Sequence, residues 1–118
     1  MDVNKEKKLL RIFMSNTDKY EHQPLYEVIV YAAQKQGLAG ATVLKGIMGF
    51  GASSVVNSLK FWEVSEKIPV IVEIIDESDK IDFFYETIRH YFDKHEKGLL
   101  VTIEKVNVVL YKSGKIKE

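Results

Sequence analysis

ATVLKGIMGFGASS, residues 41–54, is the stretch that decides the fold of this chain. Residues 41–48 alternate apolar side chains with the period of two that is typical of a β-strand, with Val43 and Ile47 on one face. Three glycines lie within six residues at its end, around one large apolar side chain, Phe50. Because glycine loses more conformational freedom on folding than any other residue, this cluster predicts a positive φ or the close approach of another group where the strand ends.

Two interpretations of the glycines stay open. The loop that follows is small and polar, and bare amides and hydroxyls on such a loop can hold a phosphate or another anion. Alternatively, the glycines only shape a turn or a bulge in a hairpin. Known motifs do not fit: Lys45 precedes Gly46, the reverse of a P-loop, and Ser54 replaces the third glycine of a dinucleotide fingerprint. A nucleophile elbow fails too, because Val55 stands where a glycine should follow Ser53.

Length and composition describe one globular domain. The 118 residues are enough for one hydrophobic core, and 17 basic residues balance 17 acidic ones. Zero net charge gives no reason to expect nucleic acid or an acidic membrane as a partner. The absence of cysteine excludes disulfides, thiolate metal sites and a cysteine nucleophile. No apolar run approaches the roughly 20 residues that span a bilayer, and Arg11 interrupts the run near the basic start, so we expect a soluble, cytoplasmic protein without a signal peptide.

The first part of the chain predicts a strand followed by a helix. Residues 1–8 are a polar, flexible lead, and residues 9–14 form a short strand with apolar side chains on both faces. Pro24 stands at the first position of the helix, and Gly37 ends it. Between them, apolar side chains recur at helical spacing, at Leu25, Val28, Ile29, Ala32 and Ala33.

After the glycines, the pattern predicts a strand and a second helix. Residues 52–67 form a long excursion, and residues 70–75 are a continuous run rich in β-branched residues, which is typical of a strand buried on both faces. Asp76 can cap the next helix, and Asp79 lies in its first turn. The apolar stripe of this helix ends before Gly98 and consists of Ile81, Phe84, Ile88, Tyr91 and Phe92.

A last strand is expected over residues 99–111, followed by a polar tail, residues 112–118. The alternation changes face between Ile103 and Val106, which a bulge at Glu104 and Lys105 would explain.

The element order β-α-β-β-α-β predicts an α+β fold over residues 9–111, the ferredoxin-like sandwich. In it, a four-stranded antiparallel sheet carries two helices on one face. The strands are apolar on both faces, whereas a sheet with one face in water would alternate more cleanly. We therefore expect other subunits to bury the second face, and predict a homo-oligomer.

Several segments resemble the PII-like proteins, a family of unknown function related to the nitrogen-signalling PII proteins and to CutA-type trimers. The similar segments are PLYE (24–27), GLAGATV (37–43), GIMGFGA (46–52), PVIVEIID (69–76) and GLLVT (98–102). The resemblance spans nearly the whole chain, from residue 8 to residue 111, and the glycine stretch is its most specific part.

The resemblance implies a ferredoxin-like subunit that forms a homotrimer, the PII-like trimer, with its sheets facing the central axis. It also implies ligand clefts between subunits, which in PII relatives bind adenine nucleotides, so ADP, AMP or ATP is the expected ligand. Residues 52–67 would correspond to the flexible loop through which PII proteins contact their targets. Since the family is often linked with fluoride-export channels, a membrane transporter such as a fluoride exporter is the implied partner.

One connection departs from the PII pattern. The phosphate-gripping loop of PII proteins, between the second helix and the last strand, is rich in glycine and basic residues. Here residues 94–98 read KHEKG, with a single glycine. A further run, SGKI at residues 113–116, follows the last strand; it could reach a neighbour's cleft, but we interpret it as a plain polar tail.

The candidate ligand-binding residues are Lys45, Gly46, Gly49, Phe50, Gly51, Ala52, Ser53 and Ser54. The backbone amides of the last two glycines and of the alanine would contact phosphate, the two serines would add hydroxyl donors, and the lysine would supply charge. Phe50 would either stack on a base or plug a subunit interface; both roles stay open.

The remaining titratable residues give weaker indications. His90 and His95 are separated by about 140° round a helix, so they could not hold one metal from one face, and we expect them and His22 to be solvated or capping. Glu73 needs a partner if it is buried, and Arg11 is the nearest candidate in strand-pairing terms. A structural Glu73–Arg11 pair and a functional role are both open.

No nucleophile with its base and no carboxylate pair of stated geometry is readable, so we do not expect an enzyme. The preferred function is a trimeric PII-like signalling protein that binds an adenine nucleotide. The alternative is a CutA-like structural or metal-responsive trimer without nucleotide binding.

Overall fold

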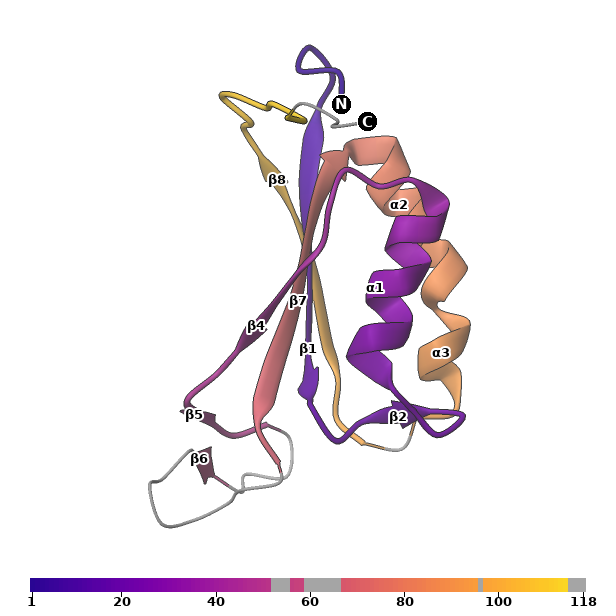
Figure 1. Cartoon of the computed structure of the whole chain (residues 1–118), viewed down its shortest axis with the longest axis vertical. Helices are drawn as coiled ribbons and strands as arrows, with labels where there is room; N and C mark the ends of the chain where they lie inside the picture. The colour runs from indigo at the N-terminus through magenta and orange to yellow at the C-terminus, as the bar shows by residue number, and fades with distance from the viewer. Residues whose placement is uncertain (52–55, 59–66, 96, 115–118) are drawn as a thin grey trace.

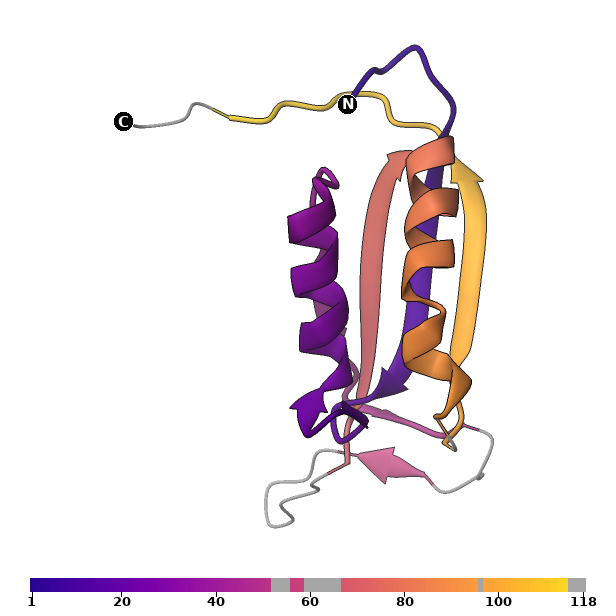
Figure 2. The same cartoon turned by 90° about the vertical axis from the view of Figure 1, so that its right-hand side faces the viewer.

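The computed structural model describes residues 1–51, 56–58, 67–95 and 97–114. Its main sheet has four strands, in the order β4 (Thr42–Lys45), β7 (Pro69–Glu77), β1 (Lys7–Ser15) and β8 (Leu100–Val106). All neighbouring strands are antiparallel. One face of the sheet carries the helices α1 (Leu25–Gln36) and α2 (Ser78–Ile88), and the short α3 (His90–Asp93) follows α2 (Figures 1 and 2). This arrangement confirms the ferredoxin-like α+β sandwich.

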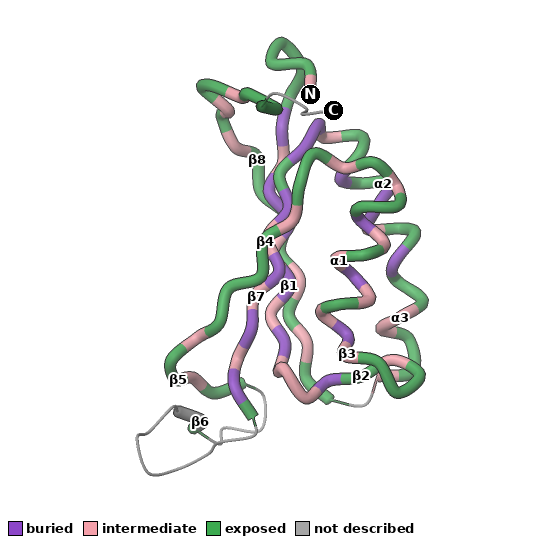
Figure 3. The backbone as a smooth tube through the Cα atoms, in the orientation of Figure 1, coloured by how far each residue is buried: buried purple, intermediate pink, exposed green. Residues whose placement is uncertain are grey.

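The hydrophobic core lies between the sheet and the helices. Alternate side chains of the two central strands point toward the helices, and Leu10, Ile12 and Val72 are completely buried there. The helices meet them with Ile29 of α1 and Phe84 of α2, which are also completely buried. Figure 3 shows buried segments on the strands of the sheet and on the helices, alternating along each element with half-buried and exposed ones. Each such side chain contributes about 1.5–3 kcal/mol through its burial.

α1 has the ends that its sequence predicts, within one residue. Pro24 precedes the first helical residue instead of occupying it, since it also ends β3 (Gln23–Pro24), which pairs with β2 (Lys19–Tyr20). Gly37 follows the helix with φ 81°, in the left-handed region, and its N–H satisfies carbonyl oxygens of the last turn.

Asp76 does not cap α2, contrary to the sequence prediction. It lies within β7 and is buried, and its Oδ2 accepts a hydrogen bond from the N–H of Ala39 at 2.8 Å. Its Oδ1 accepts a second hydrogen bond from the N–H of Glu77 at 2.7 Å. The residue before α2 is therefore Glu77, and the Asp76 carboxylate anchors the connection between α1 and β4 instead.

The second helical segment is interrupted once. α2 ends at Ile88, and α3 resumes after Arg89. The expected apolar stripe is nevertheless present, since Ile88 is buried and Tyr91 and Phe92 pack partly buried against the core.

β1 begins at Lys7, two residues earlier than expected, because residues 1–6 contact the sheet and α2. The N–H of Asp2 donates to Glu77 Oε2 at 2.8 Å, and the N–H of Ser78 donates to the carbonyl of Glu6 at 2.8 Å. Lys7 is buried and donates through Nζ to the carbonyls of Asp2 and Lys5.

β8 is shorter than the sequence suggests. Its last residue, Val106, pairs with Lys7, the first residue of β1, so β1 offers no further residue to pair with residues 107–111. The prediction of a strand up to residue 111 is therefore wrong. The register runs without interruption through Glu104 and Lys105, so the predicted bulge is wrong as well.

The single strand expected over residues 41–48 is two strands. β4 ends at Lys45, and β5 (Met48–Gly49) pairs with β6 (Asn57–Ser58) in a small antiparallel sheet of its own. The chain leaves the main sheet at Gly46, whose N–H donates to the carbonyl of Pro69 at 2.7 Å. Most of the predicted excursion over residues 52–67 lies outside the described residues.

In the described ranges, no helix combines the length and the apolar character needed to cross a membrane.

Candidate functional site

The glycine stretch borders a cavity of about 650 Å³ at the end of the sheet remote from the N-terminus (Figure 1). Four of the predicted site residues line it: Gly46, Gly49, Phe50 and Gly51. The side chain of Phe50 is 71% exposed, so within one subunit it is available to a ligand or to a neighbouring subunit. Both roles expected for Phe50 therefore stay open.

A close approach, and not a positive φ, explains the first glycine of the cluster. A Cβ at Gly46 would lie 2.8 Å from Cγ of Pro69, too close for any side chain. Gly51 is different, since no described atom lies within 4 Å of the place where its Cβ would stand. Gly46 is thus required by packing against β7, whereas Gly51 leaves open space beside the cavity.

The other predicted site residues are not brought to the cavity. Lys45 pairs in register with Val70, whose side chain points to the helices, so its own side chain lies on the helix side of the sheet. It does not line the cavity. Ala52, Ser53 and Ser54 lie outside the described residues.

Sequence reasoning missed the residues that complete the cavity. Phe13 of β1 and Ile71 of β7 form its floor from the sheet face that the helices leave uncovered. Two lysines, Lys67 and Lys97, line it from before β7 and before β8, and Gly98 follows the second of them. One signal for the pair Lys97 and Gly98 was available, because both belong to the connection that corresponds to the phosphate-gripping loop of PII proteins.

The same uncovered face carries an ion-pair network further along the strands. Arg11 donates through Nε to Glu73 Oε2 at 2.7 Å and through Nη1 to Glu104 Oε1 at 2.7 Å. The hydrogen bond from Arg11 to Glu73 is the largest cause that raises the pKa of Arg11, and the charges of both carboxylates add to it. The structural Glu73–Arg11 pair is thus confirmed, with Glu104 as a third member that sequence reasoning missed.

The histidines divide into two kinds. His22 is exposed in the β2–β3 turn with φ 70°, and His90 Nδ1 lies 2.8 Å from the carbonyl of Thr87, as solvated and capping residues would. His95 is different: its side chain is 9% exposed, and its Nε2 lies 3.6 Å from Oδ1 of the buried Asp18. Among the described residues, no three His, Asp or Glu side chains gather closely enough to hold a metal ion.

Chemically, the cavity can bind an anion that carries an apolar or aromatic group. The N–H of Gly46 is already donated to Pro69, so Gly49 and Gly51 are the glycines whose backbone could meet an anion. Two lysines supply positive charge at the edge of the cavity. Phe13, Ile71 and Phe50 provide apolar surface. A volume of about 650 Å³ falls within the roughly 300–1,000 Å³ of small-ligand sites.

Solved structures with this fold define the class to which the subunit belongs. A protein from Thermus thermophilus, described as a putative PII-like signaling protein, aligns with a TM-score of 0.60 and 17% identity over 86% of this chain and 88% of its own. CPII from Thiomonas intermedia K12, solved bound to ADP and bicarbonate, aligns with a TM-score of 0.58 and 14% identity over 87% of this chain and 90% of its own. The chain therefore has the PII-like variant of the ferredoxin fold.

Sequence similarity then identifies the family. The family model DUF190, described as "Uncharacterized ACR, COG1993", matches residues 7–108. A UPF0166 protein of Aquifex aeolicus (strain VF5) is 40% identical over 104 residues, which cover 88% of this chain and 94% of the relative. A UPF0166 protein of Methanocaldococcus jannaschii is 33% identical over 87 residues, which cover 70% and 80%. The chain belongs to the DUF190 family.

Proposed function

We propose that this chain is a PII-like regulatory protein that binds an adenine nucleotide, ADP, AMP or ATP, in the cavity beside Gly46 and Gly51. The observation that carries the proposal is the cavity itself, where the glycine stretch meets the lysine and glycine of the connection before β8. That CPII, a protein of the same fold, has been solved with ADP and with AMP supports the choice of nucleotide.

The lining suggests how a nucleotide would lie. Phosphates would meet the amides of Gly49 and Gly51 and the ammonium groups of Lys67 and Lys97, where negative charge is favoured. The base would lie against apolar surface, with Phe50 as a stacking partner. Ala52, Ser53 and Ser54 would extend the phosphate contacts, as the sequence suggested.

The proposed protein is a homotrimer that packs through the uncovered sheet face. In register, Phe13 lies opposite Ile71 and Leu100, and Leu44 lies opposite Ile71, which forms one apolar patch on that face. Leu100 is 57% exposed and Leu44 is 43% exposed, although large apolar side chains are normally buried. A second subunit would cover this patch and would close the cavity, whose floor is part of it.

The proposed target contact is the segment of residues 52–67, and the proposed target is a membrane transporter such as a fluoride exporter. Gly51, just before this segment, and Lys67, its last residue, both line the cavity. A ligand in the cavity would therefore touch both ends of the target-binding segment, which gives a direct route from ligand to target.

A thermal-shift series tests the proposal, with AMP, ADP, ATP and cyclic AMP, each with and without magnesium. A nucleotide that binds only the folded protein raises its stability by about 2.7 kcal/mol at 100 times the dissociation constant. Gly51→Trp should abolish the shift by filling the cavity, without a local clash. Lys97→Glu should weaken it, whereas the control Lys35→Glu, in the last turn of α1, should leave it unchanged.

The proposal would be contradicted if none of the nucleotides raised the melting temperature. If divalent metals alone raised the melting temperature, the CutA-like alternative would replace it. Slow nucleotide hydrolysis, lost on a change at Lys45 or Ser53, would instead indicate an enzyme.

A further inference from the structure

The segment after β8, residues 107–114, is an arm that its own chain covers only in part: Val108 and Tyr111 are half-buried, whereas Val109 and Leu110 are exposed. Residues 106–111 read VNVVLY, a sequence of high β-propensity. The arm nevertheless has no strand partner among the described residues, because β1 begins at Lys7, which already pairs with Val106. Val109 is 88% exposed and Leu110 is 72% exposed. Figure 2 shows the arm crossing the end of the sheet and running out past α1 into open space.

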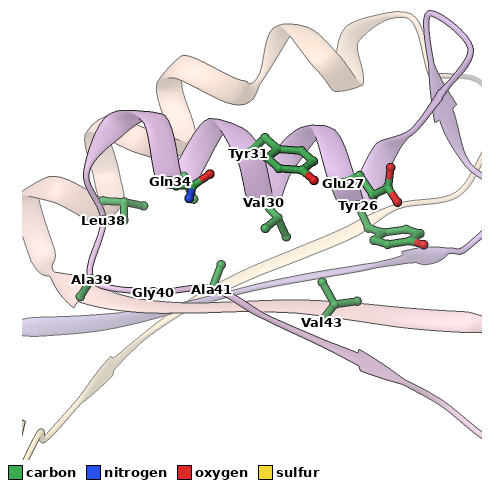
Figure 4. Close-up of a pocket in the computed structure, with 11 residues that line it drawn as sticks. Tyr26, Glu27, Val30, Tyr31, Gln34, Leu38, Ala39, Gly40, Ala41 and Val43 are labelled. Atoms are coloured by element: carbon green, nitrogen blue, oxygen red, sulfur yellow. The ribbon is translucent and has the colours of Figure 1, made fainter. Parts of the chain in front are cut away.

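At the opposite edge of the sheet, the strand β4 has a free side to which another strand could add. β4 pairs only with β7 in the described part of the chain, and all of its residues are exposed, so its outer backbone groups face solvent. Beside it lies a groove of about 490 Å³ between α1 and the chain leading into β4. Figure 4 shows Tyr26 and Val30 pointing from the helix toward the strand, and Ala41 and Val43 pointing back.

The charges of the arm and of the groove also fit one another. The groove carries a carboxylate, Glu27, on its helix side, and the arm carries an ammonium group, Lys112, directly after its apolar run. Both residues are exposed in the single subunit. Their attraction would set the direction in which the arm lies along the groove.

We propose that the arm of one subunit docks in the α1–β4 groove of a second copy and adds a strand to its free edge. Main-chain hydrogen bonds to β4 would hold the arm, and the groove would take its apolar side chains. Donor and acceptor are different surfaces of the same chain, so the contact is heterologous and closes into a ring when the rotation permits. The inference rests on the proposed assembly and specifies which surfaces join its copies.

Disulfide trapping tests the proposal, because the chain contains no native cysteine. The variant Leu110→Cys/Tyr31→Cys places one thiol on the arm and one on the rim of the groove. Its matched control is Leu110→Cys/Phe83→Cys, since Tyr31 and Phe83 are aromatic residues with 66% and 67% exposure on neighbouring helices. Under oxidation, we expect covalent dimers and trimers on a non-reducing denaturing gel for the first variant and only monomers for the control.

A second measurement uses an arm that cannot enter an apolar groove. Val109→Asp/Leu110→Asp changes two exposed side chains and should leave the melting temperature of the subunit unchanged. It should weaken self-association by roughly tenfold or more in sedimentation experiments, as the loss of two anchors would. Val109→Asp, added alone to the trapping variant Leu110→Cys/Tyr31→Cys, should also remove the covalent species.

Monomers only from Leu110→Cys/Tyr31→Cys would overturn the proposal, because the arm would then lie free or on its own groove. Equal cross-linking of the control would overturn it too. The outcome is independent of nucleotide binding. If ADP raises the melting temperature but the variant does not cross-link, the arm contact alone is refuted. If the variant cross-links but no nucleotide raises the melting temperature, the nucleotide site alone is refuted.

Discussion

At the scale of single residues, the two glycines at the ends of the cavity have opposite roles. Gly46 has no room for a side chain, since a Cβ would meet the ring of Pro69 at 2.8 Å. Gly51 has no described atom within 4 Å of the place where its Cβ would stand. The sequence shows both as members of one cluster, and only the position of Pro69, more than twenty residues further along the chain from Gly46, separates them.

We expect Gly46→Ala to destabilise the fold by about 1–3 kcal/mol, because the overlap with Pro69 forces β4 and β7 apart. Gly51→Ala, the matched control, should change the free energy of unfolding by no more than ~0.5 kcal/mol. Urea unfolding of both variants measures the difference, and equal effects would show that the contact with Pro69 is not what requires Gly46.

Glu77 gives a pH dependence of known sign. The hydrogen bond from the backbone N–H of Asp2 lowers the pKa of Glu77 below its usual value of 4.5, and the charge of Lys5 at 3.7 Å adds to the effect. Between the two pKa values the unfolded chain binds more protons than the folded one. The contribution of Glu77 is therefore complete above pH 4.5 and is lost as the pH falls through its lowered pKa.

Glu77→Gln should accordingly be less stable than the natural protein at pH 7, and the gap should narrow below pH 4.5. Urea unfolding between about pH 7 and about pH 3 gives this profile. Glu86→Gln, which removes an exposed carboxylate 3.1 Å from Arg89, serves as the control and should not reproduce it. A gap that stays constant over the whole range would refute the role of the Glu77 carboxylate.

At the scale of elements, the ends of strands and helices depend on neighbours that are distant in sequence. β8 stops where β1 begins, although its sequence remains strand-like for five more residues. Asp76 looks like a helix cap, yet its carboxylate accepts a hydrogen bond from Ala39 because the α1–β4 connection lies beside the end of β7. Local pattern finds these elements and places their ends only approximately.

Asp76→Ala should destabilise the fold by about 1–3 kcal/mol, because the N–H groups of Ala39 and Glu77 would lose their acceptor. Asp79→Ala, in the exposed first turn of α2, is the matched control and should cost less than ~1 kcal/mol. Chemical denaturation compares the two. If Asp79→Ala were the more destabilising change, the hydrogen bonds of Asp76 would not be the main contribution, and Asp79 would be the residue that stabilises the start of α2.

At the scale of the whole molecule, the helices cover one sheet face, and the other carries an apolar patch beside an ion-pair network. Such a surface is typical of an interface between subunits. Arg11 satisfies two carboxylates within the subunit, so burial of this face would not leave a charge without its partner.

Leu100→Asp should therefore reduce the proposed trimer to monomers without unfolding them, since Leu100 is exposed within the subunit. Phe83→Asp, on the solvent side of α2, makes the same kind of change away from the patch and should leave the assembly intact. Light scattering after size exclusion gives the molar mass of each. An unchanged trimer for Leu100→Asp would place the interface elsewhere.

The sequence by itself determined the order of the main elements, the ferredoxin-like fold and the apolar second face, and it offered Arg11 as a partner for Glu73. These follow from periodicity and strand order, which are local properties of a chain or simple consequences of topology. It also picked out four of the residues that line the candidate cavity, because a cluster of glycines at a strand end is visible in any sequence.

Only the tertiary structure decided which side chains complete that site. Lys67 and Lys97 are thirty residues apart and line the same cavity, because the connections before β7 and before β8 both border it. Lys45, adjacent to the glycines in sequence, is turned to the other sheet face by the pleat of β4. The physical reason is the same in each case: a cavity is formed by segments that packing brings together, and packing acts between residues whose sequence separation carries no pattern.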